Sequence, residues 1–361
     1  MRIKALSVIF CVLFAISLTA CNPATKSATG QNTQAQATTT AATEPPSAVN
    51  PLSGMNDLSP SDIGKRPIAM MINNLSSSGK NNAHEVQSGV GKAEIVYETL
   101  AEGGVTRYLA VFSNIYKDED YIGTIRSSRY TYAELALGHD ALYVHCGSDD
   151  LYTTPFMKQM GMDDLDLGAN ASSAGERKKN GKAFEHTLYT TGKKLSKVID
   201  KLDRRTDLRA EKTKPYFNFN SPDSPKSLSL PALNVKVKFS DSYISNFRYD
   251  EKTGDYKKGQ GGNAQKDYYT GKQIAVKNVI VLFTEIATRP DNYHTKADLG
   301  SGSGYYFSNG TYTTIKWSKN GPKNPLSLSD ENGQPLSINA GHSWICITEQ
   351  KLKNDCVIEQ S

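Results

Sequence analysis

The pattern of apolar residues changes near residue 225, and this change sets what the chain can fold into. Before that point, short apolar runs typical of strands alternate with stretches of helical spacing. After it, β-rich runs such as ISNFRYD and SWICITE follow one another, separated by Asn, Gly, Asp and Pro. Strands that alternate with helices build layers around one sheet. We therefore predict an α+β or α/β domain with a mixed sheet over residues 58–225, followed by a mainly β domain over residues 226–361.

The spacing of apolar residues and the positions of turn residues predict the helices and strands of the first domain. Val90, Ala93, Val96, Tyr97 and Leu100 recur at helical spacing and are followed by two glycines, which predicts a helix within residues 89–104. Residues 150–182 are polar and rich in glycine, as expected for a long surface loop. We expect further strands over residues 66–74, 106–115, 121–126 and 140–147, and further helices over residues 127–138 and 190–202.

The first residues indicate where the protein is located. Two basic residues precede the apolar run Ala5–Ser17, which is too short to span a bilayer comfortably and fits a signal peptide over residues 1–20. The sequence LTAC at residues 18–21 resembles a bacterial lipobox, which implies cleavage before Cys21 and attachment of lipid, such as palmitate, to it. The alternative is an ordinary signal peptide followed by a chance cysteine. The lipobox predicts an extracytoplasmic protein anchored to the membrane through Cys21, on the outer face of the cytoplasmic membrane.

The segment after Cys21 is polar. It is rich in Thr, Ala, Gln, Ser and Pro, so it cannot bury enough surface to offset the entropy of ordering. We predict a lipidated cysteine and a disordered tether over residues 21–57, whose first thirty or so residues would reach roughly 30 Å as a flexible coil.

The net charge is +5, and the signal peptide carries two positive charges and no acid, which leaves about +3. That charge is too small to indicate a nucleic-acid partner.

Several motifs carry a family resemblance. The segments RPIAMMINN, AEIVYETLAEGGVTRYLAVFS, IGTIRSSRYTYAELALGHDALYVHCGS and AGHSWICI resemble the YerB-like lipoproteins of Gram-positive bacteria. The resemblance covers nearly all of residues 60–348 and implies an N-terminal and a C-terminal family domain. It implies little about mechanism, because the family is chiefly known as a domain of unknown function. In relatives the first strand usually ends Ile-Asp-Asn, whereas this chain has Asn73 in place of the acid.

The segment that contains Arg126 and Arg129 is the strongest candidate for a binding site. If Ser127 caps the helix that follows, both arginines flank its first turn, where the helix dipole is already positive. Two guanidinium groups there require a negative partner. Two alternatives are open: pairing inside the protein with Glu98 or Glu102, or an anionic ligand such as a phosphate or carboxylate.

Three acids lie four residues apart. On a helix, Glu94, Glu98 and Glu102 would share one side, either as a solvated acidic face or as partners of basic groups such as Arg107. A carboxylate beside a cleft could also act as general acid or base on a glycosidic bond, and Glu102 is the candidate for this. We expect Glu98, beside Tyr97, to be buried and paired.

His145 and Cys146 are neighbours on a predicted strand and therefore point to opposite faces. We expect Cys146 to face the core. His145 would then lie at the carboxyl end of its strand, on the rim of the site with Asn73, either as a satisfied structural residue or as a catalytic one. No P-loop, nucleophile elbow or metal-ligand spacing is present, so we expect no cofactor and no metal. A disulfide between Cys346 and Cys356 is conceivable in an extracytoplasmic protein, whereas the odd number of three cysteines favours mostly free thiols, so both alternatives are open.

These features favour three classes of function. The first is a protein that either binds or modifies an anionic envelope polymer such as peptidoglycan or teichoic acid. The second is a non-catalytic adaptor that binds another envelope protein. The third is the solute-binding lipoprotein of a transporter, which ranks last because such proteins have two similar lobes and these halves differ.

Overall fold

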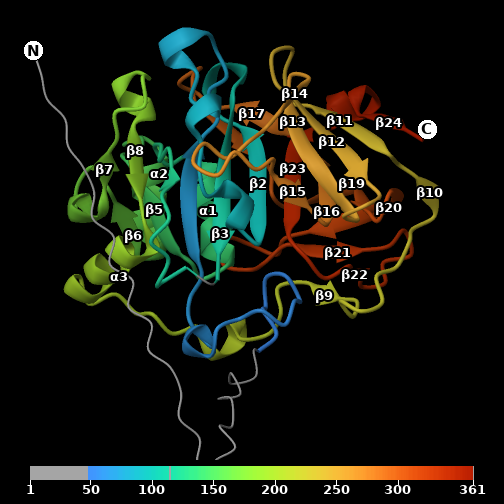
Figure 1. Ribbon diagram of the computed structural model, residues 1–361, viewed down its shortest axis with the longest axis horizontal. Coiled ribbons are helices and arrows are strands. Elements are labelled where there is room, and N and C mark those ends of the chain that lie inside the picture. Colours follow the sequence, from blue (N-terminus) through green and yellow to red (C-terminus); the bar gives the residue numbers. More distant parts are fainter. Residues whose placement is uncertain (1–47, 114, 361) are drawn as a thin grey trace, which may run out of the picture. The chain divides into compact units, whose positions relative to one another are not determined.

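One eleven-stranded sheet runs through the centre of the molecule and takes strands from both predicted domains (Figure 1). The computed structural model describes residues 48–113 and 115–360. The strand order is β10-β20-β19-β16-β23-β2-β3-β1-β5-β6, with β21 paired to β20. These strands are β1 (Ile68–Asn73), β2 (Ile95–Leu100), β3 (Thr106–Phe112), β5 (Leu142–His145), β6 (Asp164–Asp166), β10 (Leu230–Pro231), β16 (Asn278–Thr284), β19 (Ser301–Ser308), β20 (Thr311–Ser318), β21 (Ser327–Ser329) and β23 (Ser343–Glu349).

Six strands of this sheet run in the same direction. β1, β5 and β6 pair in parallel, as do β2, β23 and β16, and β3 lies antiparallel between β1 and β2. The carboxyl ends of all six strands therefore lie at one edge of the sheet. In Figure 1 this is the upper edge, where β1 leads into the segment that follows it. Parallel sheets commonly carry their sites at this edge.

The two halves of the chain are joined through the middle of the sheet. β23, near the end of the chain, pairs in parallel with β2, so that Val96 lies opposite Trp344 and Glu98 opposite Cys346. The prediction of a mixed sheet with helices in the N-terminal half, followed by a mainly β C-terminal half, is confirmed. The sequence does not reveal that strands from both sides of residue 225 complete one sheet.

A second sheet belongs wholly to the C-terminal half. It has the order β14-β13-β12-β11-β24, with β15 paired to β13. Its strands are β11 (Asn234–Lys238), β12 (Ile244–Asp250), β13 (Asp255–Gln260), β14 (Asn263–Ala264), β15 (Ala275–Val276) and β24 (Val357–Glu359). Val235, Val237 and Phe247 point from it into a core shared with the central sheet. Its other face is more exposed, as the alternating burial of β11 and β12 shows.

Helices cover both faces of the central sheet. α1 (Tyr130–Gly138) and α2 (Thr153–Met160) pack on one face, and α3 (Gly192–Lys201) contributes Leu195, Val198 and Ile199 to the core on the other. The prediction that residues 150–182 form a loop is wrong in part, because α2 lies there and buries Phe156 and Met157. None of the helices in the described parts of the chain is long and apolar enough to cross a membrane.

The helix predicted over residues 89–104 does not form. Residues 95–100 are the strand β2, preceded by a 3₁₀ turn at Val90–Lys92 and followed by another at Glu102–Gly104. β2 lies in the middle of a sheet that is covered on both faces, so its apolar residues are nearly continuous and do not alternate. Three of them fall at helical spacing by coincidence.

The smaller sheets consist of β4 (Ile122–Gly123), β7 (Glu176–Arg177) and β8 (Leu188–Thr190), of β9 (Asn218–Phe219) and β22 (Ser337–Ile338), and of β17 (Ile286–Thr288) and β18 (Thr295–Ala297).

Candidate functional site

The segment 125–129 crosses the carboxyl ends of β1 and β5. The backbone N–H of Arg126 donates to Met71 O at 3.0 Å, and Cys146 N–H donates to Arg126 O at 3.1 Å. Ser128 N–H continues the pattern with Gly147 O at 2.9 Å. The arginines are therefore held on a backbone that is fixed to two strands, at the edge where the sequence analysis expected a site.

The start of α1 differs from the prediction. Arg129, and not Ser127, is the N-cap residue, and its side chain makes no capping hydrogen bond. Ser127 contributes its carbonyl oxygen instead, which accepts a hydrogen bond from Arg107 Nη1 at 2.8 Å. The prediction of Ser127 as a helix cap is therefore wrong, because the chain stays extended for two residues more.

Glu102 holds two of the arginines. One carboxylate oxygen accepts from Arg107 Nη2 at 3.2 Å and the other from Arg129 Nε. The Glu102 residue is only 6% exposed. Burial alone would raise the pKa of Glu102, but the hydrogen bond from Arg129 and the charge of Arg107 outweigh it, so its pKa lies below the ordinary value. A carboxylate engaged on both oxygens is a poor general acid, so the geometry favours a positioning role over the predicted catalytic one.

Of the three arginines in this site, Arg126 is the one without a partner among the described residues. Its half-buried guanidinium makes no hydrogen bond or ion pair with any described residue, whereas Arg107 and Arg129 share Glu102. Burial, followed by the charge of Arg129, lowers the pKa of Arg107 to about 10, and Arg126 contributes to this shift. Glu102 thus compensates two of the three guanidinium groups. Of the two alternatives, internal pairing accounts for Arg107 and Arg129 but leaves Arg126 uncompensated.

His186 is a member of the site that the sequence analysis did not select. It is fully buried, and its Nδ1 lies 2.7 Å from Asn73 Nδ2. Asn73 Oδ1 accepts from Leu75 N at 3.1 Å, so the Asn73 amide group faces the histidine with its NH₂. Nδ1 is then the acceptor, and Nε2 carries the proton of the neutral ring.

The proton on His186 Nε2 has no acceptor. This nitrogen is buried without a hydrogen-bond partner, and Glu185 is 3.8 Å away. Burial lowers the pKa of His186, and the charge of Arg126 adds to the shift, so the ring is neutral and the guanidinium lies within electrostatic reach. An unused N–H donor within electrostatic reach of an unpaired guanidinium is an arrangement that suits an anion.

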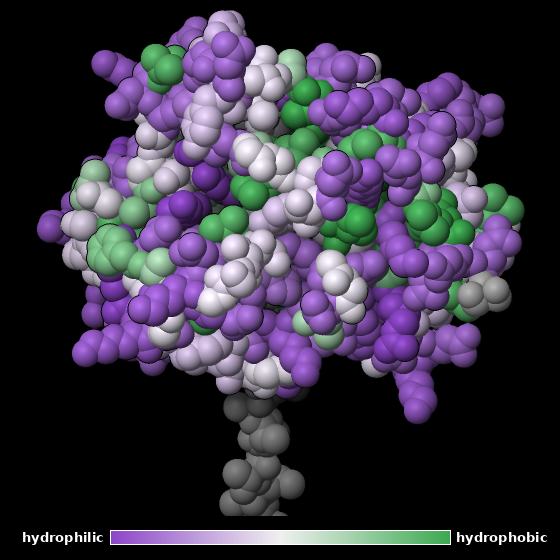
Figure 2. All heavy atoms as spheres, turned by 90° about the horizontal axis from the view of Figure 1, so that it is seen from above, coloured by the Kyte–Doolittle hydropathy of each residue, from purple (hydrophilic) through white to green (hydrophobic). Residues whose placement is uncertain are grey.

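The C-terminal half adds two cations next to α1. Ala297 N of β18 donates to Thr131 Oγ1 at 3.1 Å, which holds the β17–β18 hairpin against the helix. The Arg289 guanidinium lies 4.4 Å from the ring centre of Tyr130, and Lys296 Nζ lies 4.9 Å from the same centre. Neither cation has an ion pair with a described carboxylate. Figure 2 looks onto this end of the molecule and shows mostly hydrophilic side chains, with apolar ones in small scattered groups.

Two predicted members of the site lie elsewhere in the hydrogen-bond network. Glu98 is buried and paired, as expected, but its partners are Thr106, Ser245 and Trp344 rather than the arginines. His145 is 1% exposed, with its Nδ1 3.0 Å from Gly147 O.

The prediction that His145 lies on the rim is therefore wrong, because this residue is buried. Cys146 packs against the core, as predicted, but is only half-buried. Cys346 is buried, and Cys146, Cys346 and Cys356 are all free thiols. Within the described ranges, no cluster of three His, Cys, Asp or Glu side chains could hold a metal ion.

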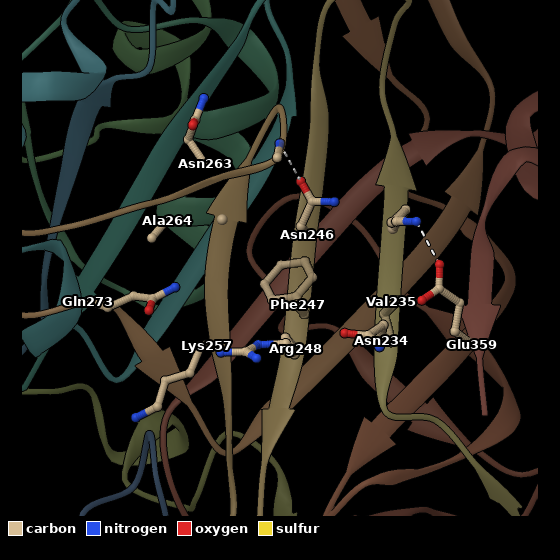
Figure 3. Close-up of a pocket in the computed structure, with 13 residues that line it drawn as sticks. Asn234, Val235, Asn246, Phe247, Arg248, Lys257, Asn263, Ala264, Gln273 and Glu359 are labelled. Atoms are coloured by element: carbon tan, nitrogen blue, oxygen red, sulfur yellow. Dashed lines mark hydrogen bonds and ion pairs between the residues drawn. The ribbon is translucent and has the colours of Figure 1, made fainter. Parts of the chain in front are cut away.

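A separate groove lies on the outer face of the C-terminal sheet (Figure 3). Its volume is about 380 Å³. Gly259 lines it and allows β14 to approach β13 closely, since a Cβ atom there would come within 2.8 Å of Asn263 O. Lys236 pairs with Glu359 at 2.6 Å across the groove, whereas Arg248 has no ion pair among the described side chains. Most residues that line this groove are polar or charged, and it shares no residue with the arginine site.

Comparisons with known proteins match the chain over most of its length. Residues 52–205 match the family described as Protein of unknown function (DUF3048) N-terminal domain, and residues 235–345 match its C-terminal domain. A protein of Bacillus subtilis (strain 168) named "Putative lipoprotein YerB" is 27% identical over 290 residues, which cover 78% of this chain and 81% of that protein. The crystal structure of YerB protein from Bacillus subtilis has a TM-score of 0.72 and 24% identity, covering 86% of this chain and 99% of that one.

Proposed function

The chain belongs to the DUF3048 family, with both its N-terminal and its C-terminal domain, and from this premise we propose that it is a lipid-anchored protein that binds an anionic cell-envelope polymer. The phosphate or carboxylate of teichoic acid or peptidoglycan would occupy the site at Arg126 and His186. Anchoring through Cys21 and a position on the outer face of the cytoplasmic membrane are parts of the same proposal. Residues 1–47 lie outside the described residues, and the similarity to a lipoprotein supports the anchor.

The observation that carries the proposal is the pair of unused donors. Arg126 offers guanidinium N–H groups without a carboxylate, and His186 offers an Nε2–H without an acceptor. An uncompensated charge and an unsatisfied buried donor each cost stability in the empty site. A bound anion would satisfy both. Glu102 supports the arrangement by orienting Arg107 and Arg129 beside it.

Binding without cleavage is the version that the geometry supports. Both oxygens of Glu102 accept from arginines, and His145 is buried against backbone and acidic groups. Neither side chain presents a free proton donor or acceptor to a polymer. The continuous central sheet also differs from two lobes joined by hinge strands, so it gives no support to a transporter's solute-binding protein.

The proposal is tested with a chain that begins at Asn22. Such a chain keeps every described contact, because the described residues begin at Ala48. Wild type and Arg126→Ala are incubated with Gram-positive sacculi that retain or lack teichoic acid, and pelleted protein and released fragments are measured. We expect the wild type to pellet and Arg126→Ala to pellet at least about tenfold less, since a lost charge-assisted contact is worth about 1.5–3 kcal/mol.

The matched control is Arg248→Ala, which removes an exposed arginine that also lacks an ion pair. It should pellet like the wild type. Equal pelleting of all three chains, or no pelleting at all, contradicts the proposal. Release of muropeptides that depends on Arg126 would instead make the protein an enzyme, and loss of pelleting only when teichoic acid is absent identifies the polymer.

A second candidate function is an adaptor for another envelope protein, and the groove around Arg248 favours it. The groove is open, polar and lined by strands, so an extended acidic segment of a partner would fit it. In cross-linking on membranes, Arg248→Ala should then lose a product that Arg126→Ala keeps. The same products from both variants would contradict this candidate.

A further inference from the structure

A cavity lies at the opposite edge of the central sheet from the arginine site. Its volume is about 410 Å³, which is within the range of small-molecule pockets. Pro67 precedes β1 and lines the cavity, whereas Asn73, the last residue of β1, belongs to the arginine site. In Figure 1 this is the lower edge, where the first described residues meet the segment around residue 210.

The walls of the cavity are largely apolar and rigid. Leu52, Leu208 and Tyr216 line it together with four prolines, Pro51, Pro67, Pro215 and Pro325. Proline fixes its own φ and has no backbone N–H, so these walls offer little movement and few donors. Such a surface does not suit a strongly hydrated polymer.

Tyr216 is held in place before any ligand binds. Its ring stacks on His139 with the centroids 3.9 Å apart and the planes at 16°. Its hydroxyl accepts from the Tyr97 hydroxyl at 3.2 Å and from Leu326 N–H at 3.0 Å. The aromatic wall is therefore preorganised, which lowers the entropic cost of binding.

The rim of the cavity is positively charged. Lys65, Lys212, Lys214 and Lys323 line it, and Glu211 is the one acid among the lining residues. Lys65 is paired with Asp207 at 2.6 Å, and Lys212 donates to the carbonyl oxygens of Gly138 and Lys323. Lys214 and Lys323 are exposed and have no ion pair within the described part of the chain.

We propose that this cavity binds a small amphiphilic anion, that is, a carboxylate or phosphate attached to an apolar chain or ring. The apolar walls would bury the body of such a ligand, and the lysines at the rim would hold its charged group. The site is distinct from the proposed polymer site, because it lies at the other edge of the sheet and shares no residue with it. Failure of one proposal leaves the other standing.

The test uses the chain from Asn22 and the fluorescent anion 1-anilinonaphthalene-8-sulfonate as probe. Its fluorescence should rise on binding, and decanoate and decyl phosphate should both displace it. Neutral decanol and inorganic phosphate should displace it far less, because each supplies only half of the required chemistry. Displacement by only one of the two decyl anions identifies the preferred head group.

Two variants locate the probe. Lys214→Glu/Lys323→Glu reverses the charge of two exposed residues at the rim and should weaken probe binding at least about tenfold. Lys236→Glu/Lys257→Glu makes the same change of charge at the groove of the C-terminal sheet and should change binding less than about twofold. Leu208→Trp fills the cavity without a change of charge and should also abolish binding.

The proposal is overturned if the wild type shows no displaceable probe binding, or if the rim variant and the groove variant bind the probe equally. Retained binding in folded Leu208→Trp would also overturn it. Thermal unfolding of each variant confirms that the fold is kept, since both lysine pairs are on the surface.

Discussion

Lys258 Nζ lies 4.0 Å from Glu98 Oε2, and both residues are buried, with exposed fractions of 0% and 1%. Lys258 belongs to β13 of the C-terminal sheet, and Glu98 belongs to β2 of the central sheet. The Trp344 ring contributes to the same pocket: its Nε1 donates to Glu98 at 3.0 Å, and its ring centre lies 5.0 Å from Lys258 Nζ. A buried charge pair thus connects the two halves of the chain at the centre of the fold.

Removing both partners of this pair should destabilise the protein by less than the two single removals added together. Glu98→Gln leaves an uncompensated ammonium in the core, and Lys258→Met leaves a carboxylate that keeps its neutral donors. We expect each single change to cost about 3–5 kcal/mol of unfolding free energy, and the double change to cost clearly less than the sum. Urea unfolding of the four chains gives the coupling energy. Additive costs would mean that the pair does not act as a unit.

The arginine site should respond differently to loss of its acid and loss of its free arginine. Glu102→Gln leaves two buried guanidinium groups without a carboxylate and should cost about 3 kcal/mol of stability. Arg126→Ala removes a charge that has no partner, so the unfolding free energy should stay within about 0.5 kcal/mol of wild type. Guanidinium denaturation at neutral pH measures both. If Arg126→Ala is as costly as Glu102→Gln, then Arg126 is a structural residue and the proposed ligand contact loses its basis.

Protonation of Glu102 should contribute to the decrease in unfolding free energy at acidic pH. The folded pKa of this carboxyl is depressed below its unfolded value of about 4.5. The ionised Glu102 carboxylate therefore contributes fully to the unfolding free energy above pH 4.5, and this contribution is lost as the pH falls through the pKa of the folded state. The loss of stability below pH 4.5 should accordingly be smaller in Glu102→Gln than in wild type, which the same unfolding experiment at several pH values shows.

A buried histidine predicts a second pH dependence at higher pH. Burial, followed by the charge of Lys212, lowers the pKa of His139 to about 3, whereas the unfolded chain binds this proton near pH 6.5. Stability should therefore fall as the pH drops from 6.5 toward 3, because the unfolded state binds more protons in that window. Between pH 7 and pH 5 the wild type should lose about 2 kcal/mol that His139→Gln does not lose.

His342→Gln is the matched control for that experiment, since it removes a histidine that is only half-buried. Its stability should change with pH as the wild type does. Parallel curves for wild type and His139→Gln would show that His139 takes up its proton at the same pH in both states. The comparison uses the change in unfolding free energy with pH, so a pH-independent destabilisation by the substitution does not affect it.

The sequence predicted the pairing of an arginine with Glu102 better than the elements around it. Arg129 and Arg107 both donate to Glu102, one of the acids expected as their partner, because the charges themselves are visible in the sequence. β2 was misread as a helix, since its burial on both faces comes from strands and helices far away in sequence. The positions of His186 and Arg289 were not predicted, for the same reason. Both lie on segments that are separated from residues 125–129 by tens of residues, so their positions near this segment are visible only in the structure.

Gly192 makes a close backbone contact that the sequence does not predict, although the sequence predicts the helix that contains it. The helix α3 is where the amphipathic pattern placed it, and Thr191 caps it by accepting from Lys194 N. The pattern does not show that a Cβ atom on Gly192 would lie 1.6 Å from the carbonyl oxygen of Ile115. That oxygen belongs to the backbone, so no side-chain rotation relieves the overlap.

Gly192→Ala should therefore destabilise the protein by at least about 2 kcal/mol, even though alanine is the better helix former. Gly91→Ala is the control: its nearest contact would be an ordinary 3.7 Å to Ile274, so the change should be neutral or stabilise by up to about 1 kcal/mol. Thermal and urea unfolding compare the two. Equal stability of the variants would mean that α3 shifts away from Ile115 at little cost, and that its packing against the sheet is looser than the buried Leu195 and Ile199 indicate.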